Sequence, residues 1–284
     1  MDIRSLALRG AAWVAAARIA INLLGLVSTL FLARLLTPDD FGLVAIGTTI
    51  LAVVSSFTDL PLSTALIQHA QPDETHFNTV FTLNFIRSAL VTAAVAAAAY
   101  PISIWYGDAR LFELIMALSL SSFIMCLSNP KRVLFTRELN FHADFVQGIA
   151  MKLTGFVVGI VFALIYKNYW ALVVGSLAAQ VSFVVISYIQ LPYLPAMTFR
   201  RSRELLSFSI WLSYSQIVNT VSTKIDQLLI GFYLGSEKLG IYSFGDNLAN
   251  LPTRELTTPI SQMLFPWIVA FTSQQYILVH NVLH

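Results

Sequence analysis

Charged and amide side chains recur at helical spacing inside long apolar stretches of this chain. Arg18 is followed by Asn22, Gly25 and Thr29, a spacing that places all four on one face of a helix. Charges at membrane depth are costly, so they usually face a cavity or a partner. The residues that we select on this basis as the lining of a hydrophilic cavity are Arg18, Asn22, Asp59, Arg87, Asn219, Lys224, Asp226, Asp246, Asn247 and Arg254.

The cations in this set favour an anionic substrate. They are Arg18, Arg87, Lys224 and Arg254. Arginine can hold a phosphate group in a bidentate fork, and the neighbouring amides suit sugar hydroxyls. A second interpretation stays open, in which Lys224 pairs with Asp226, Arg87 pairs with Asp59, and the pairs only hold helices together. Polar residues near the ends of the apolar stretches can also extend to the membrane interface.

Motifs of enzymes and metal sites are absent from the sequence. There is no Walker P-loop, no G-x-S-x-G and no H-E-x-x-H, and the five histidines lack ligand spacing. His142 with Asp144 is the one local pair that an enzyme acting on lipids could use. We therefore predict no catalytic residues, no metal and no cofactor, and the sequence shows no aromatic-basic cluster for nucleic acid.

The composition points to a membrane protein. Of 284 residues, 57% are hydrophobic and 11% are charged, against roughly 25% charged residues in a soluble domain. This excludes an ordinary soluble enzyme and a disordered chain. The single cysteine, Cys126, cannot form a disulfide within the chain.

The apolar stretches predict an all-α, polytopic transmembrane fold with about eight spans, since a spanning helix needs about 20 apolar residues. Short polar breaks such as Thr37 to Asp40, Gln68 to Asn78 and Pro130 to Asp144 separate them. The first stretch is too long for a signal peptide and is predicted to be an uncleaved helix. The predicted spans are 10–36, 42–67, 79–105, 111–129, 145–166, 170–191, 206–234 and 240–268.

The basic residues predict that both termini are cytoplasmic, because cytoplasmic loops carry an excess of Lys and Arg. With the N-terminus inside, the outer loops hold Arg110, Lys167 and Lys238. The inner segments hold Arg4, Arg9, Lys131, Arg132, Arg137, Arg200, Arg201 and Arg203.

The chain also contains an internal repeat. At an offset of 198 residues Trp13 meets Trp211, Gly42 meets Gly240, and Pro61 meets Pro259, without a gap over some 60 residues. Because six spans fill one period, the two copies share one orientation, as in parallel-repeat transporters. We predict a six-helix lobe at 1–198, the first two helices of a second lobe at 199–267, and an atypical tail at 268–284.

Three segments resemble one family of transporters. They are ARLLTPDDFGLVAI at 33–46, LSNPKRVLFTRELNF at 127–141 and KIDQLLIGFYLGSEKLGIYSFGDNL at 224–248. They are similar to the polysaccharide flippases, in particular the Wzx-like branch, of the multidrug/oligosaccharidyl-lipid/polysaccharide exporter superfamily. The resemblance covers about residues 1–267.

The resemblance implies a two-lobed bacterial inner-membrane protein of 12 to 14 helices. Such a protein flips an undecaprenyl-pyrophosphate-linked oligosaccharide from the cytoplasmic to the periplasmic leaflet by alternating access, for lipopolysaccharide or exopolysaccharide biosynthesis. Its partners would be this lipid-linked oligosaccharide, the bilayer and the polysaccharide polymerase machinery, with no nucleic acid. Because later helices of the family are missing and the tail after Pro266 has no charge, we expect a truncated copy, in which the activity is lost if the cavity does not close.

A cation-coupled multidrug exporter of the same superfamily is the alternative. That branch often carries an acidic residue in its first helix, whereas the first helix here carries Arg18. A cavity of Arg and Lys would also repel an organic cation, so the sequence favours the flippase.

Overall fold

A computed structural model of the chain describes residues 20–68, 72–137, 141–206, 213–214, 216–247 and 249. These residues form helices and connecting segments, without a strand among them, which confirms the all-α prediction. The chain divides into two compact units, Leu24–Phe244 and a second unit that joins Met1–Leu23 to Gly245–His284. The account below concerns the Leu24–Phe244 unit.

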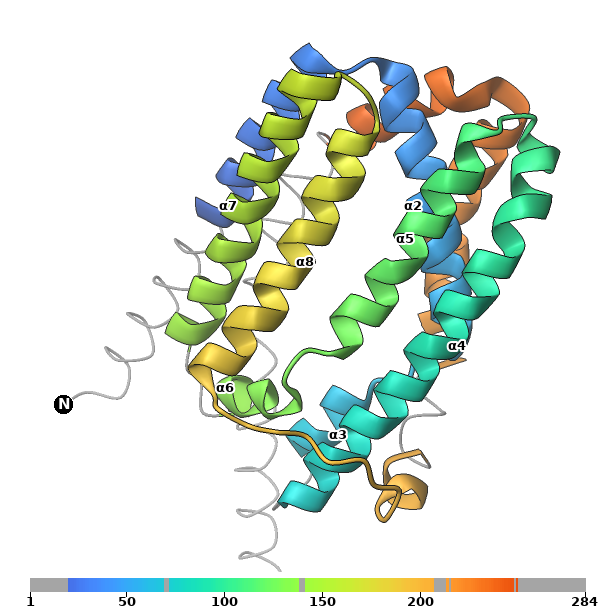
Figure 1. Cartoon of the computed structure of the whole chain (residues 1–284). Helices are drawn as coiled ribbons and strands as arrows, with labels where there is room; N and C mark the ends of the chain where they lie inside the picture. Colours follow the sequence, from blue (N-terminus) through green and yellow to red (C-terminus); the bar gives the residue numbers. More distant parts are fainter. Residues whose placement is uncertain are drawn as a thin grey trace, which may run out of the picture. The chain divides into compact units, whose positions relative to one another are not determined.

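Helices of very different length follow one another along this unit (Figure 1). An apolar helix, Ala20–Leu35, leads into it. Helical residues 216–244 come last, after an extended segment at 192–199. The helices between them are α2 (Pro38–Thr58), α3 (Leu62–Gln68), α4 (Glu74–Tyr106), α5 (Arg110–Cys126), η1 (Pro130–Arg132), α6 (Val133–Arg137), α7 (Phe141–Tyr166) and α8 (Trp170–Gln190).

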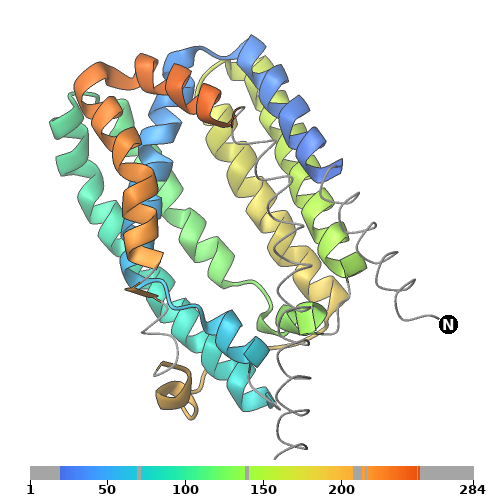
Figure 2. The same ribbon diagram turned by 180° about the vertical axis from the view of Figure 1, so that it is seen from behind.

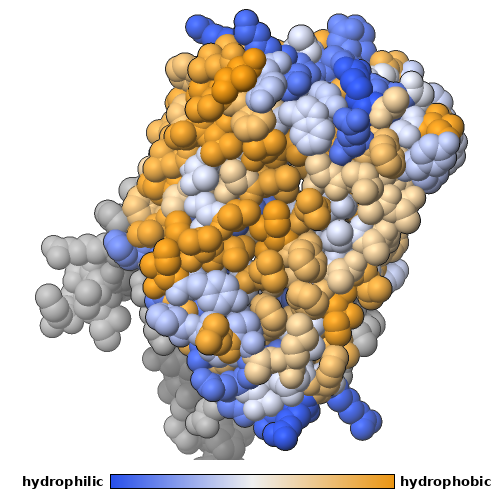
Figure 3. Space-filling model, in the orientation of Figure 1, coloured by the Kyte–Doolittle hydropathy of each residue, from blue (hydrophilic) through white to orange (hydrophobic). Residues whose placement is uncertain are grey.

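Four of the described helices, α2, α4, α7 and α8, are long and apolar enough to cross a membrane. Their outward-facing side chains are apolar too, since Val157 and Leu164 on α7 and Val185 on α8 are about half exposed. Figure 3 shows apolar residues covering the middle of one face and hydrophilic residues gathered at its two ends. This is the surface of a membrane protein, and the count of eight spans stays a prediction.

Capping sets where two of the long helices begin. The Thr37 hydroxyl accepts from the Asp40 N–H at 3.3 Å, and the Thr37 N–H donates to the Asp40 carboxylate at 2.9 Å. This capping box starts α2 at Pro38, so the predicted turn at Thr37 to Asp40 is largely a helix N-terminus. Asp73 caps α4 in the same way, and the predicted loop at 68–78 ends earlier than expected.

The predicted span 42–67 is two helices, which corrects the sequence analysis. Helix α2 ends at Thr58, three residues lie outside a helix, and α3 begins at Leu62. Pro61 explains the break, because proline lacks an N–H and disfavours helical geometry in the residue before it.

Glycines allow close helix contacts at two places. On α7 and α8, which lie side by side in Figure 1, a Cβ on Gly175 would lie 3.0 Å from the Gly155 carbonyl oxygen. Gly155 therefore has the packing role that the GxxxG spacing favours, whereas a Cβ on Gly159 would have its nearest atom at 3.5 Å.

The second close contact joins two segments that the sequence analysis predicts to be equivalent parts of a repeat. A Cβ on Gly42 would lie 1.7 Å from the Ser236 carbonyl oxygen, and a Cβ on Gly240 would lie 1.8 Å from the Pro38 carbonyl oxygen. Pro38 and Ser236 are 198 residues apart, as are Gly42 and Gly240. Such a reciprocal contact is what a two-fold relation between copies requires, so it supports the repeat.

Side-chain contacts continue along this junction. The Ser236 hydroxyl donates to Asp39, which also accepts from Arg110 at 2.8 Å. Residues 216–234 then run along α2, as Figures 1 and 2 both show. At the middle of α2 the Thr49 hydroxyl meets Gln227 at 2.9 Å.

The glycine contact predicts that a single methyl group destabilises the unit. Gly42→Ala and Gly240→Ala should each lower the melting temperature of the purified chain in detergent by roughly 3–10 °C, because the backbones must separate. The control is Gly159→Ala, whose Cβ would make an ordinary contact at 3.5 Å. Scanning fluorimetry measures the effect. Alanine favours a helix more than glycine does, so the melting temperature should rise if no close contact exists. A rise in both Gly42→Ala and Gly240→Ala would therefore contradict the contact.

Candidate functional site

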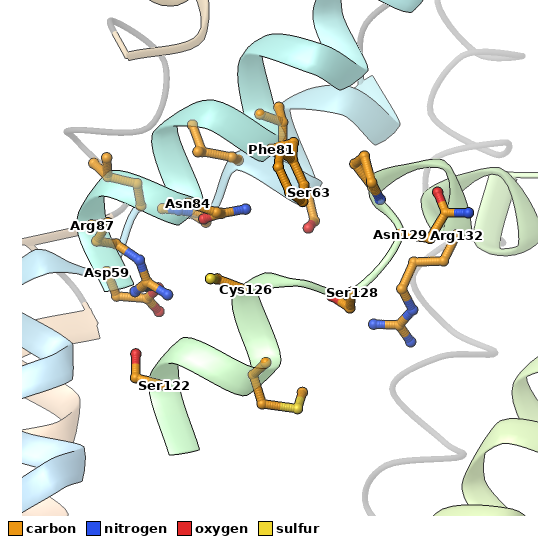
Figure 4. A pocket seen from close by; sticks show the side chains of 16 residues that line it. Asp59, Ser63, Phe81, Asn84, Arg87, Ser122, Cys126, Ser128, Asn129 and Arg132 are labelled. Atoms are coloured by element: carbon orange, nitrogen blue, oxygen red, sulfur yellow. Dashed lines mark hydrogen bonds and ion pairs between the residues drawn. The ribbon is translucent and has the colours of Figure 1, made fainter. Parts of the chain in front are cut away.

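A polar cavity of about 350 Å³ lies where α2 breaks. Its walls come from the α2–α3 connection, α4, the C-terminal end of α5 and the segment that enters η1 (Figure 4). The sequence analysis selected two of its residues, Asp59 and Arg87. The polar and thiol residues of its lining are Asp59, Ser63, Asn84, Arg87, Ser122, Cys126, Ser128, Asn129 and Arg132.

Asp59 and Arg87 form an ion pair in the wall of this cavity. Arg87 Nη1 donates to Asp59 Oδ1 at 2.8 Å. Asp59 is the C-cap residue of α2, so the end of that helix sets its position. Arg87 lies on α4. The ion pair between Arg87 and Asp59, which the sequence analysis left open, is therefore present. Both of its residues also line the cavity. Arg87 Nε is buried without a hydrogen-bond partner.

A residue of the second copy touches the same place. The Ser213 hydroxyl donates to the Asp59 main-chain carbonyl at 2.6 Å. That carbonyl lies at the end of α2, where the break leaves helix carbonyls without partners within the helix. The cavity therefore lies next to Ser213, in the segment that is predicted to begin the second copy.

Arg132 is a cavity residue that the sequence analysis placed only in an inner loop. Its guanidinium lies over the Phe183 ring, 4.6 Å from the ring centroid, and 3.9 Å from Asp144 Oδ1. Burial lowers the pKa of Arg132, and the Asp144 charge acts against this shift. Its Nε, like that of Arg87, is buried without a partner.

The short helix η1 holds Arg132 in place, and its start is visible in the sequence. Asn129 Oδ1 accepts from the Lys131 N–H at 2.9 Å, and Pro130 occupies the first helical position. The Asn129 amide also donates to the Leu191 carbonyl at 2.6 Å, which ties the loop to the end of α8. The Asn-Pro pair was the signal that could have marked Arg132 as fixed in position.

A second polar cluster lies halfway along α2. Lys224 Nζ donates to Gln227 Oε1 at 3.1 Å, and the Thr49 hydroxyl donates to the same oxygen. Lys224 thus binds Gln227 rather than Asp226, which accepts from the Tyr242 hydroxyl. Thr49 and Asp59 are ten residues apart on α2, or about 15 Å, so the structure separates Lys224 from Arg87.

The remaining selected residues are Arg18, Asn22, Asn219, Asp246, Asn247 and Arg254. Arg18 and Arg254 lie outside the described residues, and the Asn219 carbonyl accepts from the Thr223 hydroxyl at 2.9 Å. Asn22, Asp246 and Asn247 belong to the other compact unit.

Lys152 is an intramembrane cation that the sequence analysis missed. It is exposed near the middle of α7, inside the predicted span 145–166. Its Nζ lies 3.6 Å from the point where a Cβ on Gly25 would be, and so it lies next to the first apolar helix at Gly25. A single lysine between Met151 and Leu153 was the signal for it.

Metal ligands do not gather in the part of the chain that the structure describes. No group of three or more His, Cys, Asp or Glu side chains there could hold an ion. The chemistry that the two clusters offer is the binding of oxygen-rich and anionic groups by guanidinium, ammonium, amide and hydroxyl donors.

Long apolar helices with polar clusters among them define a polytopic helical membrane protein. Residues 31–282 match the family described as polysaccharide biosynthesis protein, and this chain belongs to that family. The match extends beyond residue 267, where the resemblance by motif ends.

Several curated proteins are similar to the chain. It is 27% identical to an uncharacterized membrane protein in the cps region of Klebsiella pneumoniae, over 94% of this chain and 56% of that protein. It is also 27% identical to the lipopolysaccharide biosynthesis protein WzxC of Escherichia coli strain K12, over 94% of this chain and 55% of that protein. The succinoglycan biosynthesis transport protein ExoT of Rhizobium meliloti is 25% identical over 84% of this chain and 49% of its own length.

The chain spans about half the length of these curated relatives. No solved structure matches it.

The ion pair in the cavity predicts energetic coupling between Asp59 and Arg87. Asp59→Asn and Arg87→Gln should each destabilise the chain, and the double variant should lose less than the sum, by about 1–2 kcal/mol for a half-buried pair. Unfolding in mixed micelles with rising SDS measures the free energies. Asp59→Asn combined with Arg110→Gln is the control and should be additive, because Arg110 pairs with Asp39 and Asp108 instead. Additive losses for Asp59 and Arg87 would contradict the coupling.

Proposed function

We propose that this chain is part of a transporter that flips an undecaprenyl-pyrophosphate-linked oligosaccharide across a bacterial inner membrane. The observation that carries the proposal is the match to the polysaccharide biosynthesis family over most of the chain. Its bacterial relatives include one named for lipopolysaccharide biosynthesis and one named for succinoglycan transport. The role is transport rather than catalysis, and it serves lipopolysaccharide or exopolysaccharide biosynthesis.

The substrate path runs between the two repeat copies. Lys224, Gln227 and Thr49 lie where residues 216–234 meet α2, and they offer an ammonium and polar groups to sugar and diphosphate oxygens. Arg18 and Arg254 lie outside the described residues, and we propose from their sequence positions that they add guanidinium groups to this path. A path lined by cations suits a diphosphate and repels the organic cations that a multidrug exporter would carry.

Transport proceeds by alternating access, in which the two lobes rock about the bound substrate. The reciprocal contact of Gly42 and Gly240 closes the junction at the end of the bundle that holds Arg110. The positive-inside rule makes this the periplasmic end, with both termini in the cytoplasm. Opening it releases the substrate to the outer leaflet, where the polymerase machinery receives the sugar.

Export of polymer tests the path residues. Arg18→Ala and Lys224→Ala, made in a full-length transporter that carries this sequence as its first half, should each abolish surface polysaccharide. Both variants should still insert into the membrane, since each change removes a cation rather than an apolar contact. Immunoblots of membrane fractions and of cell-surface polymer provide the two readouts.

Arg34→Ala is the matched control, because Arg34 is an exposed cation outside the selected set. It should leave export unchanged. Normal export in both Arg18→Ala and Lys224→Ala would remove the assignment of the path.

A further inference from the structure

The cavity at the α2 break contains two arginines with unused hydrogen-bond donors. Arg87 enters from α4, and Arg132 enters from η1 on the opposite side, with Cys126 and Ser128 between them (Figure 4). Both Nε atoms are buried without a partner. Buried donors in proteins nearly always have an acceptor, and here two side chains that line one cavity each carry a donor without one.

The lining has a positive charge and neutral donors. Asp59 is the only carboxylate among the lining residues, and Arg87 Nη1 already binds it. Asn84, Ser122 and Ser128 add an amide and two hydroxyls. A ligand that satisfies these groups must be an anion rich in oxygen.

The guanidinium of Arg132 has no carboxylate within hydrogen-bonding distance among the described residues. Its nearest carboxylate oxygen, on Asp144, is 3.9 Å away, which is too far for a hydrogen bond. The Phe183 ring supports one face of the guanidinium and leaves the edge with its N–H groups free to bind. A guanidinium stays charged even when buried, so Arg132 keeps its attraction for anions.

The volume limits the size of the ligand. About 350 Å³ is at the lower end of ligand pockets, large enough for a phosphate or diphosphate and too small for an oligosaccharide. We propose that this cavity is a phosphate-binding site in which Arg87 and Arg132 hold the oxygens from opposite sides. It lies about 15 Å along α2 from the Lys224 cluster, so it is separate from the path proposed above.

Two sources could supply the phosphate. One is the diphosphate of a lipid-linked sugar, which rests on the proposed function, and the other is the headgroup of an anionic membrane lipid. The same arginine chemistry serves both.

Binding of inorganic pyrophosphate to the purified chain in phosphatidylcholine nanodiscs tests the site. Calorimetry should show saturable binding that weakens at least tenfold in Arg132→Gln and in the double variant Asp59→Asn/Arg87→Gln, which leaves no unpaired carboxylate behind. Arg200→Gln removes an exposed arginine near the same end of the bundle and should bind like the wild type. No saturable binding, or equal affinity in all variants, would overturn the proposal.

Cys126 locates the bound anion, because it is the single cysteine and lines the cavity. Pyrophosphate should slow its reaction with a methanethiosulfonate reagent at least threefold in the wild type and in Arg200→Gln, but not in Arg132→Gln. Binding that leaves the reaction rate unchanged in the wild type places the anion elsewhere and overturns the proposal.

Nanodiscs that contain phosphatidylglycerol separate the two sources. If the lipid headgroup occupies the site, they should raise the apparent dissociation constant for pyrophosphate in the wild type but not in Arg132→Gln. An unchanged constant supports the diphosphate as the ligand. These binding measurements do not depend on transport. Normal export in Arg18→Ala and Lys224→Ala would therefore contradict the proposed path without contradicting the phosphate site, and absence of pyrophosphate binding would contradict the phosphate site without contradicting the path.

Discussion

The break in the helical backbone at Asp59 to Pro61 is the constraint on which the polar interior of this protein depends. A membrane offers no water to main-chain groups, so a helix can break only where other groups supply hydrogen bonds. Here Ser213 donates to the exposed Asp59 carbonyl, and the Asp59 side chain turns toward Arg87. The ion pair, the cavity and the contact with the second copy all begin at this point.

The junction of the two copies depends on a different constraint, the space around main-chain atoms. Gly42 and Gly240 bring backbones so close that neither position has room for a Cβ. Polar groups then cross the junction where the helices meet, from Ser236 to Asp39 and from Thr49 to Gln227. Apolar side chains pack across the same junction, where Leu239 joins Leu43, Ile46 and Ile50 of α2 in one buried cluster.

Sequence analysis predicted most of the helices and part of the candidate site. Apolar length located the spans, because the bilayer imposes it, but not their ends, which Thr37 and Asp73 set by capping. The break inside the second span was missed although Pro61 is visible in the sequence. Asp59 and Arg87, which were predicted to line a hydrophilic cavity, lie in the wall of the cavity at the α2 break. Arg132 and Lys152 were not selected, because Arg132 was counted only as a topology signal and Lys152 stands among apolar neighbours.

The sequence by itself determined the class of protein and the two-copy pattern. Composition and the 198-residue offset are properties of the chain that no packing can change. Only the tertiary structure decided which polar groups meet. Arg87 pairs with a residue 28 positions away, and Arg132 stacks on Phe183 of another helix. Helical spacing fixes the face on which a side chain lies, but the neighbour on that face depends on how the helices pack.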